Sequence, residues 1–75
     1  MTPEEKVIEG VFTYHKPHGR QMAIYEELRE KTKVLALYTM RHCPKNVDRT
    51  QAIKKLREFV MWANSSIANE EVFQL

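Results

Sequence analysis

The most regular hydrophobic pattern in the chain lies in residues 48–69. Apolar residues recur there at spacings of three and four, which places them in one stripe along a helix. This stripe consists of Ile53, Leu56, Val60, Ala63 and Ile67. Asp48 is a candidate N-cap, and Gln51 follows it three residues later, an arrangement typical of a capping box. The pattern therefore predicts a long helix over 48–69 whose stripe needs a partner.

A second helical pattern covers residues 20–42. Its apolar stripe consists of Ile24, Leu28, Leu35, Tyr38 and His42. Pro44 disfavours helical geometry in the residue before it, so the helix should end at this point. The short connection to residue 48 then makes the two helices antiparallel neighbours, which predicts a helical hairpin.

The second half of the 20–42 helix is apolar on almost every side. Beyond its stripe it carries Val34, Ala36, Leu37 and Met40. One partner helix cannot cover a surface of this width, so the other faces must meet the N-terminal segment or another subunit. A chain of 75 residues has little volume for its surface, and this favours another subunit. We therefore expect a homo-oligomer.

The N-terminus has the signature of a helix start. Thr2 is a candidate N-cap, Pro3 occupies the first helical position, and Glu5 completes a capping box. The predicted helix over 3–9 is short and should end at Gly10 in a left-handed conformation. We expect this helix to pack on the hairpin.

Residues 11–19 lack a helical pattern. They are rich in β-branched and aromatic residues and end with Pro17 and Gly19, which predicts an extended segment. Because the chain offers no second strand, the segment should lie over the helices, with Phe12 filling the groove between them. Tyr14 has two interpretations: its ring fills the same groove, or it stacks on a nucleobase and uses its hydroxyl for a hydrogen bond.

Together these elements predict a single all-α domain over residues 1–75. A hydrophobic fraction of 43% and only two glycines are typical of a folded helical protein. The single cysteine, Cys43, excludes an intrachain disulfide and makes a poor zinc site on its own. No apolar run approaches the roughly 20 residues that span a bilayer, and the N-terminus lacks the pattern of a signal peptide. We expect a soluble protein without a bound metal.

Charge is unevenly distributed along the chain. Residues 31–57 contain eight basic residues and one acidic residue, a balance of +7, although the whole chain carries only +2. A basic stretch of this kind favours an anionic partner such as a phosphate. Solvated surface lysines are the alternative explanation, and the charge pattern alone favours that alternative.

No arrangement of residues predicts catalysis. His15, His18 and His42 are scattered, and neither a Ser-His-Asp nor a Cys-His order stands out. The glycines, Gly10 and Gly19, do not form a phosphate-binding loop. From the residues alone we expect an oligomeric helical binding protein rather than an enzyme, with no cofactor, and composition does not select its ligand.

Several short strings are similar to those of one known family. They are Phe-Thr-Tyr-His at 12–15, Leu-Arg-Glu at 28–30, Cys-Pro at 43–44 and, most specifically, Val-Met-Trp-Ala-Asn at 60–64. The chain resembles the phage anti-CBASS type-two family, which shares a helical hairpin with the Thoeris anti-defence sponges. The resemblance covers residues 11–69, nearly the whole chain.

This resemblance implies a phage protein that acts in the cytoplasm of the infected bacterial host. Members of the family bind and sequester cyclic oligonucleotide second messengers without cleaving them, which blocks CBASS effector activation. They assemble as homohexamers and hold cyclic dinucleotides such as cGAMP in pockets between subunits, and some members have a separate site for cyclic trinucleotides. Neither a membrane nor a nucleic-acid polymer is an expected partner.

The resemblance also suggests ligand-binding residues. The family's binding tyrosine corresponds to Tyr14, and its basic partner on the first long helix corresponds to Arg29, with Lys33 one turn later as a rival. His15 and Lys16 are secondary candidates. A planar guanidinium suits the basic role because it matches phosphate oxygens and also stacks on rings.

Two other classes of function stay open at the level of sequence. A small basic helical regulator could use the 31–57 stretch to bind nucleic acid, and its binding to duplex DNA should weaken steeply as salt rises. A purely structural oligomer would bind no ligand.

Overall fold

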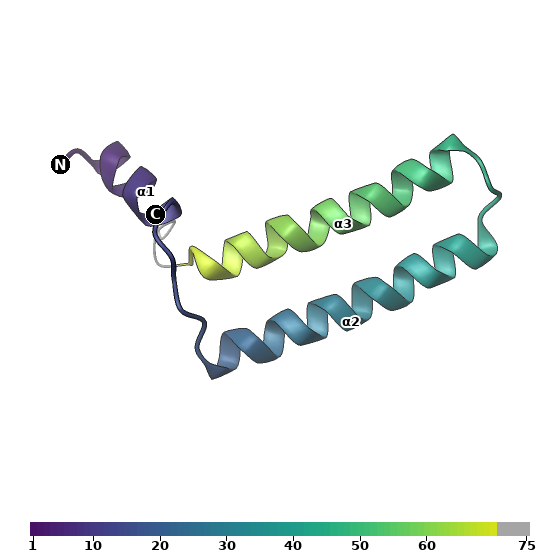
Figure 1. The fold of residues 1–75 in the computed structure, drawn as a ribbon, viewed down its shortest axis with the longest axis horizontal. Coiled ribbons are helices and arrows are strands. Elements are labelled where there is room, and N and C mark those ends of the chain that lie inside the picture. The colour runs from purple at the N-terminus through teal and green to yellow at the C-terminus, as the bar shows by residue number, and fades with distance from the viewer. Residues whose placement is uncertain (71–75) are drawn as a thin grey trace.

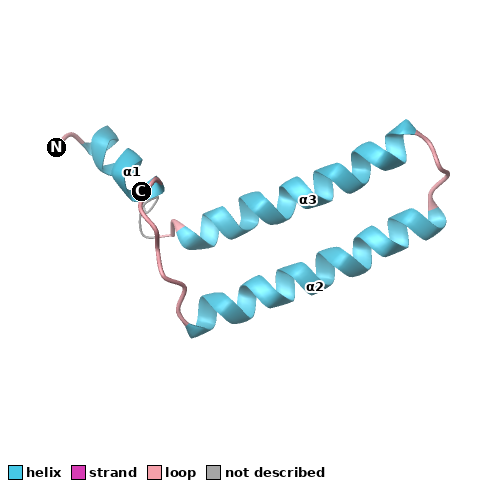
Figure 2. Cartoon of the chain, in the orientation of Figure 1, coloured by secondary structure: helices cyan, strands magenta, loops and turns pink. Residues whose placement is uncertain are grey.

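The fold is a helical hairpin preceded by a short helix. The computed structural model describes residues 1–70 and contains α1 (Pro3–Val11), α2 (Gly19–His42) and α3 (Val47–Ala68) (Figure 1). No strand occurs within residues 1–70 (Figure 2). The two long helices run antiparallel and pack on each other, which confirms the predicted all-α class and helical hairpin. Residues 71–75, the last of the predicted domain, lie outside the described part of the chain.

α3 carries the apolar stripe that the sequence predicts. Its five members, from Ile53 to Ile67, are all half-buried. The helix starts at Val47 because Asn46, and not Asp48 as expected, is the N-cap: its Oδ1 accepts a hydrogen bond from the backbone N–H of Arg49 at 2.9 Å. Asp48 lies in the first turn instead, where its charge faces the positive end of the helix dipole.

α2 begins with a capping box that the sequence analysis did not identify. The backbone N–H of Gln21 donates to Nδ1 of His18, and the backbone N–H of His18 donates to Oε1 of Gln21, both at 3.4 Å. Histidine here takes the role that serine or threonine usually has. At its other end α2 stops at His42, and Cys43 is the C-cap ahead of Pro44.

The face of α2 that meets α3 differs from the predicted stripe in its second half. Thr32, Ala36 and Thr39 are half-buried, whereas Leu35 and Tyr38 are 50% and 61% exposed. The two threonine hydroxyls donate to backbone carbonyls one turn back in their own helix, so their polar atoms are satisfied. Small residues therefore contribute to this part of the hairpin, and the larger side chains of Leu35 and Tyr38 lie mostly outside it, whereas Leu37 is half-buried.

α1 has the predicted capping box. The backbone N–H of Glu5 donates to Oγ1 of Thr2, and the backbone N–H of Thr2 donates to Oε1 of Glu5, both at 3.1 Å. Hydrogen bonds from the backbone of Thr2, and then from its side chain, hold the pKa of the Glu5 carboxyl below its usual value. The helix continues through Gly10 to Val11, and Gly10 is not left-handed, so its expected role as the helix terminator is wrong.

The expectation that α1 packs on the hairpin is also wrong. α1 packs on neither α2 nor α3, and Figure 1 shows it beyond the open end of the hairpin. Its apolar anchors are few, and Ile8 is more than half exposed. So few apolar side chains bury too little area to hold a short helix against its neighbours.

Residues 12–18 link α1 to α2 without regular structure. They pass the open end of the hairpin instead of lying along it (Figure 2). The expectation that Phe12 fills the groove between the helices is therefore wrong, since this residue is 85% exposed. The linker is held by α1, because the side chains of Thr13 and His15 bond to its last turn.

An arginine closes the turn between the long helices. Nη1 of Arg49 donates to the backbone carbonyl of Met40 at 2.9 Å and to that of Cys43 at 3.5 Å. Carbonyls at the end of a helix have no partner within it, so Arg49 satisfies the end of α2 from the start of α3. One cation of the basic stretch thus has a structural role.

One chain does not complete a hydrophobic core. Within residues 1–70 no apolar residue is fully buried. The exposed large apolar side chains include Val34, Leu35 and Tyr38 on α2 and Phe59, Met61 and Trp62 on α3. Two helices that pack along a single contact surface bury little apolar area. The hydrophobic free energy that they gain therefore offsets little of the conformational entropy lost when the chain folds.

Candidate functional site

Two of the predicted ligand-binding residues, Tyr14 and His15, meet in one hollow at the open end of the hairpin. We name this hollow the linker pocket; it has a volume of about 290 Å³. Its lining consists of Tyr14, His15, Lys16, His18, Gln21, Ala68 and Glu70. The linker forms one wall, and the start of α2 and the end of α3 form the other.

Tyr14 presents its ring to solvent beside this pocket. The residue is 82% exposed, so the interpretation in which its ring fills a groove between helices is wrong. An exposed aromatic ring offers a flat face for stacking, and the phenolic hydroxyl adds a hydrogen-bonding group at its edge. Stacking on a ligand stays a prediction for this residue.

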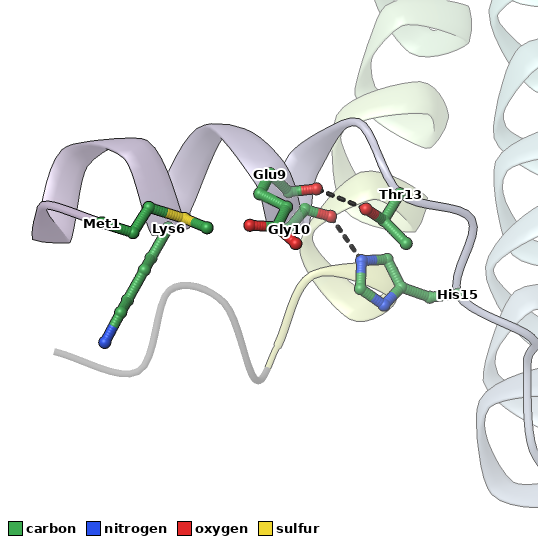
Figure 3. Close-up of a pocket in the computed structure, with 6 residues that line it drawn as sticks. All are labelled: Met1, Lys6, Glu9, Gly10, Thr13 and His15. Carbon is green, nitrogen blue, oxygen red and sulfur yellow. Dashed lines mark hydrogen bonds between the residues drawn. The ribbon is translucent and has the colours of Figure 1, made fainter.

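His15 is engaged by its own chain. Its Nε2 donates to the backbone carbonyl of Gly10 at the end of α1 (Figure 3). Because a carbonyl oxygen can only accept, this nitrogen carries the proton. His15 also borders a second hollow of about 410 Å³ beside α1. The other residues that line this hollow are Met1, Lys6, Glu9, Gly10 and Thr13.

A hydrogen-bonded cluster ties the base of the linker pocket together. Nε2 of Gln21 donates to the backbone carbonyl of Ile67 at 3.1 Å and to Oε1 of Glu70 at 2.8 Å. The same carboxylate oxygen lies 3.7 Å from Nε2 of His18. Gln21 is buried, and through it the start of α2 is joined to the end of α3.

Sequence reasoning missed this role of Gln21. The available signal is its position three residues before Ile24, which places it in register with the apolar stripe of α2. A polar side chain in such a position is buried and requires a hydrogen-bond partner. Its partners come from the end of the other long helix, more than 40 residues along the chain, and no local pattern names them.

Replacing Gln21 by alanine is expected to lower the melting temperature by about 5–10 °C. The change removes two hydrogen bonds between α2 and the end of α3, a loss of about 1–2 kcal/mol. Circular dichroism at one fixed protein concentration measures the transition. Gln51→Ala, at an exposed position of α3, is the matched control. Equal melting temperatures for the two variants would mean that the cluster adds nothing to stability.

Arg29 and Lys33 lie away from the linker pocket. They occupy exposed positions on α2, eight and twelve residues beyond Gln21, which corresponds to about 12 and 18 Å along the helix axis. Neither side chain forms an ion pair within residues 1–70. Within one chain, the structure therefore does not bring these cations to Tyr14.

Two lysines of the 31–57 stretch are paired locally. Nζ of Lys31 lies 2.8 Å from a carboxylate oxygen of Glu27, and Nζ of Lys55 lies 3.2 Å from one of Glu58. Each lysine holds the pKa of its partner carboxyl below the usual value, first through the hydrogen bond and then through its charge. Both pairs are solvent-exposed, so these two lysines fit the explanation of the basic stretch as solvated surface.

Neither a metal centre nor a membrane span is found in the described part of the chain. Within residues 1–70 no three histidine, cysteine, aspartate or glutamate side chains are grouped so that they could hold a metal ion. None of the helices in this range is long and apolar enough to cross a bilayer.

The fold and these side chains define a small helical-hairpin binding protein. An exposed aromatic ring, a polar pocket beside it and exposed surface cations suit a ligand that is both planar and negatively charged. The apolar surface on both long helices adds a second property, because exposed patches of this kind mark contacts with other proteins or other copies.

The chain belongs to the Acb2/Tad1 hairpin family, since the family model described as "Acb2/Tad1, hairpin domain" matches residues 4–68. This match confirms the resemblance to the phage anti-CBASS type-two family and the Thoeris anti-defence sponges. Membership indicates a sponge-type binding protein rather than an enzyme, and it is consistent with a cyclic oligonucleotide as ligand. Neither a curated protein nor a solved structure matches the chain.

Proposed function

We propose that this protein sequesters cyclic oligonucleotide second messengers as a phage immune-evasion protein. In this proposal it binds cyclic dinucleotides such as cGAMP intact, in the cytoplasm of the infected bacterial host, and so prevents activation of CBASS effectors. Family membership supports the ligand class. The structural observation that carries the proposal is Tyr14, whose exposed ring stands beside the polar linker pocket.

The chemistry of the ligand matches the side chains that are available. A cyclic dinucleotide carries two bases and two phosphates, so its receptor needs flat faces and cations. Tyr14 supplies the flat face in this proposal, and base–aromatic stacking tolerates different bases. Arg29 supplies the phosphate contact, with Lys33 as the rival, because a guanidinium binds two phosphate oxygens at once.

One chain does not surround such a ligand. The linker pocket of about 290 Å³ lies at the lower limit of small-molecule pockets, which measure about 300–1,000 Å³. Arg29 also lies about 12 Å beyond this pocket along α2. A second copy, related by a two-fold axis, would offer each group twice and match the symmetry of the ligand.

We therefore propose a homo-oligomer, a hexamer, with cyclic dinucleotides bound between subunits. The exposed apolar side chains on α2 and α3 support this assembly, because no residue in the described range 1–70 covers them. Cyclic trinucleotides are a second ligand class in the proposal.

A thermal-shift experiment with mass analysis of the ligand tests the proposal. Cyclic GMP–AMP at about 100 times its dissociation constant should stabilise the folded protein by about 2.7 kcal/mol, and the linear dinucleotide is the control. Heat denaturation should then release the cyclic compound unchanged. A flat response to every cyclic dinucleotide and cyclic trinucleotide would refute the sponge, and a linear product would identify an enzyme. A shift with duplex DNA that vanishes as salt rises would favour the nucleic-acid-binding regulator.

A further inference from the structure

The two residues on either side of Tyr14 both bond back to α1. Oγ1 of Thr13 donates to the backbone carbonyl of Glu9, and Nε2 of His15 donates to that of Gly10 (Figure 3). These carbonyls belong to the last turn of α1, where a helix has few partners for its acceptors, and that of Gly10 also accepts from the backbone N–H of Thr13 at 3.4 Å. The side chains of Thr13 and His15 thus serve as donors at a helix end that has no basic residue in its last turn.

This arrangement fixes the backbone of the linker around Tyr14. The linker has no regular structure, and α1 makes no packing contact with α2 or α3. The two side-chain bonds, together with the hydrogen bond from the backbone N–H of Thr13 to the carbonyl of Gly10 at 3.4 Å, are therefore the tethers found at residues 13–15 within the described range 1–70. The ring of Tyr14 stays 82% exposed. A linker backbone held in this way loses less conformational entropy when Tyr14 binds a ligand.

We infer that His15, with the help of Thr13, is a positioning residue that holds Tyr14 ready to stack, and not itself a ligand contact. This inference rests on the proposed function for the role of Tyr14. It differs from the resemblance-based expectation, in which His15 touches the ligand. The only atom of His15 with a hydrogen-bond partner in the described chain is Nε2, and that partner is the backbone of α1.

The first test uses the ligand-free protein. Backbone ¹⁵N relaxation should give high order parameters at residues 13–15 in the wild type and values falling below about 0.6 in His15→Phe, which keeps a ring but loses the donor. His15→Gln, which restores an N–H donor, should recover the order. His42→Phe, at the far end of α2 where His42 stacks on Tyr38, is the control for loss of an imidazole. Unchanged order in His15→Phe would overturn the inference.

The second test asks whether His15 acts through Tyr14. Affinity for cyclic GMP–AMP is measured for His15→Phe, Tyr14→Ala and the double variant. A positioning role predicts that His15→Phe weakens binding about tenfold in the wild type and has no further effect once Tyr14 is alanine. A direct contact predicts the same loss in both backgrounds, and this result would overturn the inference.

The two tests separate the failure of the inference from the failure of the proposed function. A wild type that binds no cyclic dinucleotide or cyclic trinucleotide refutes the sponge, whereas the relaxation experiment still decides whether His15 orders the linker. Persistent order in His15→Phe, together with strong binding by the wild type, refutes the positioning role alone.

Discussion

Replacing Tyr14 by alanine should weaken binding of a cyclic dinucleotide about 30- to 1,000-fold. Stacking of an aromatic side chain on a base is worth about 1–3 kcal/mol, and for an exposed ring we take the lower part of this range, about 1–2 kcal/mol. A two-fold site loses this contribution at both bases, so the total is about 2–4 kcal/mol. Isothermal titration with cyclic GMP–AMP measures the change. Helix content and assembly should stay as in the wild type, because the ring is 82% exposed and supports no other residue of the hairpin.

Two matched variants show whether the effect belongs to this ring. Tyr14→Phe keeps the stacking face and loses only the hydroxyl, so it should retain most of the affinity. Phe12→Ala removes the neighbouring exposed ring, at 85% exposure, and should leave binding unchanged. If Phe12→Ala is as damaging as Tyr14→Ala, the linker as a whole matters and Tyr14 is not the stacking residue.

The same titration identifies the phosphate contact. Arg29→Ala should lower the affinity about tenfold and remove part of the salt dependence of binding. A hydrogen bond to a charged group is worth about 1.5–3 kcal/mol, and solvent screening reduces this value at an exposed site. Lys33→Ala should change little if Arg29 is the contact, and the reverse order of effects would assign the role to Lys33.

Placing a carboxylate in the apolar surface of α2 should break the proposed homo-oligomer. Tyr38→Glu is expected to reduce the particle from an oligomer to a single chain in multi-angle light scattering. It should also lower the melting temperature by more than about 10 °C. The reason is that Val34, Leu35 and Tyr38 are exposed in one chain, and a subunit interface over them cannot accept an unpaired charge.

The control for this experiment is Gln51→Glu, which adds the same charge at an exposed position of α3. It should leave mass and melting temperature unchanged. A wild-type protein that is already a stable monomer would contradict both the assembly and the shared binding site. A Tyr38→Glu variant that remains oligomeric would place the interface elsewhere, with Phe59, Met61 and Trp62 on α3 as the next surface to test.

The hairpin could be predicted from the sequence because its signals are local. The stripe from Ile53 to Ile67 repeats at helical spacing, and Pro44 separates the two long helices. The capping box of Thr2 and Glu5 spans only four residues and forms as expected. Each of these features depends on backbone geometry within a few turns, so neighbouring residues suffice to specify it.

The sequence-based predictions are wrong where several neighbouring residues could take the same structural role. Asn46 and Asp48 are both good N-caps, and in the structure the side chain of Asn46 caps the helix, so that α3 begins at Val47. The second half of α2 is apolar on most sides, so periodicity could not say which face meets α3. The structure places Thr32 and Thr39 there and leaves Leu35 exposed.

For the candidate site, the sequence motif identified Tyr14 as a candidate ligand-binding residue but did not predict that its ring is exposed. The two interpretations of Tyr14 differ only in what surrounds its ring. The ring is exposed because the linker passes the open end of the hairpin and does not lie in the groove between the helices. The base of the linker pocket joins Gln21 to Ile67 and Glu70, which are far apart in the chain. Such contacts arise only when α2 and α3 lie antiparallel and side by side, so that the start of α2 is next to the end of α3.

The sequence by itself determined the helices, the capping box of α1 and the hairpin, because periodicity and capping act between residues a few positions apart. Only the tertiary structure decided which apolar residues of α2 stay outside, that α1 stands free of the hairpin, and that Gln21 bonds to Ile67 and Glu70. These outcomes depend on how whole helices approach one another, and a one-dimensional pattern is compatible with more than one such arrangement.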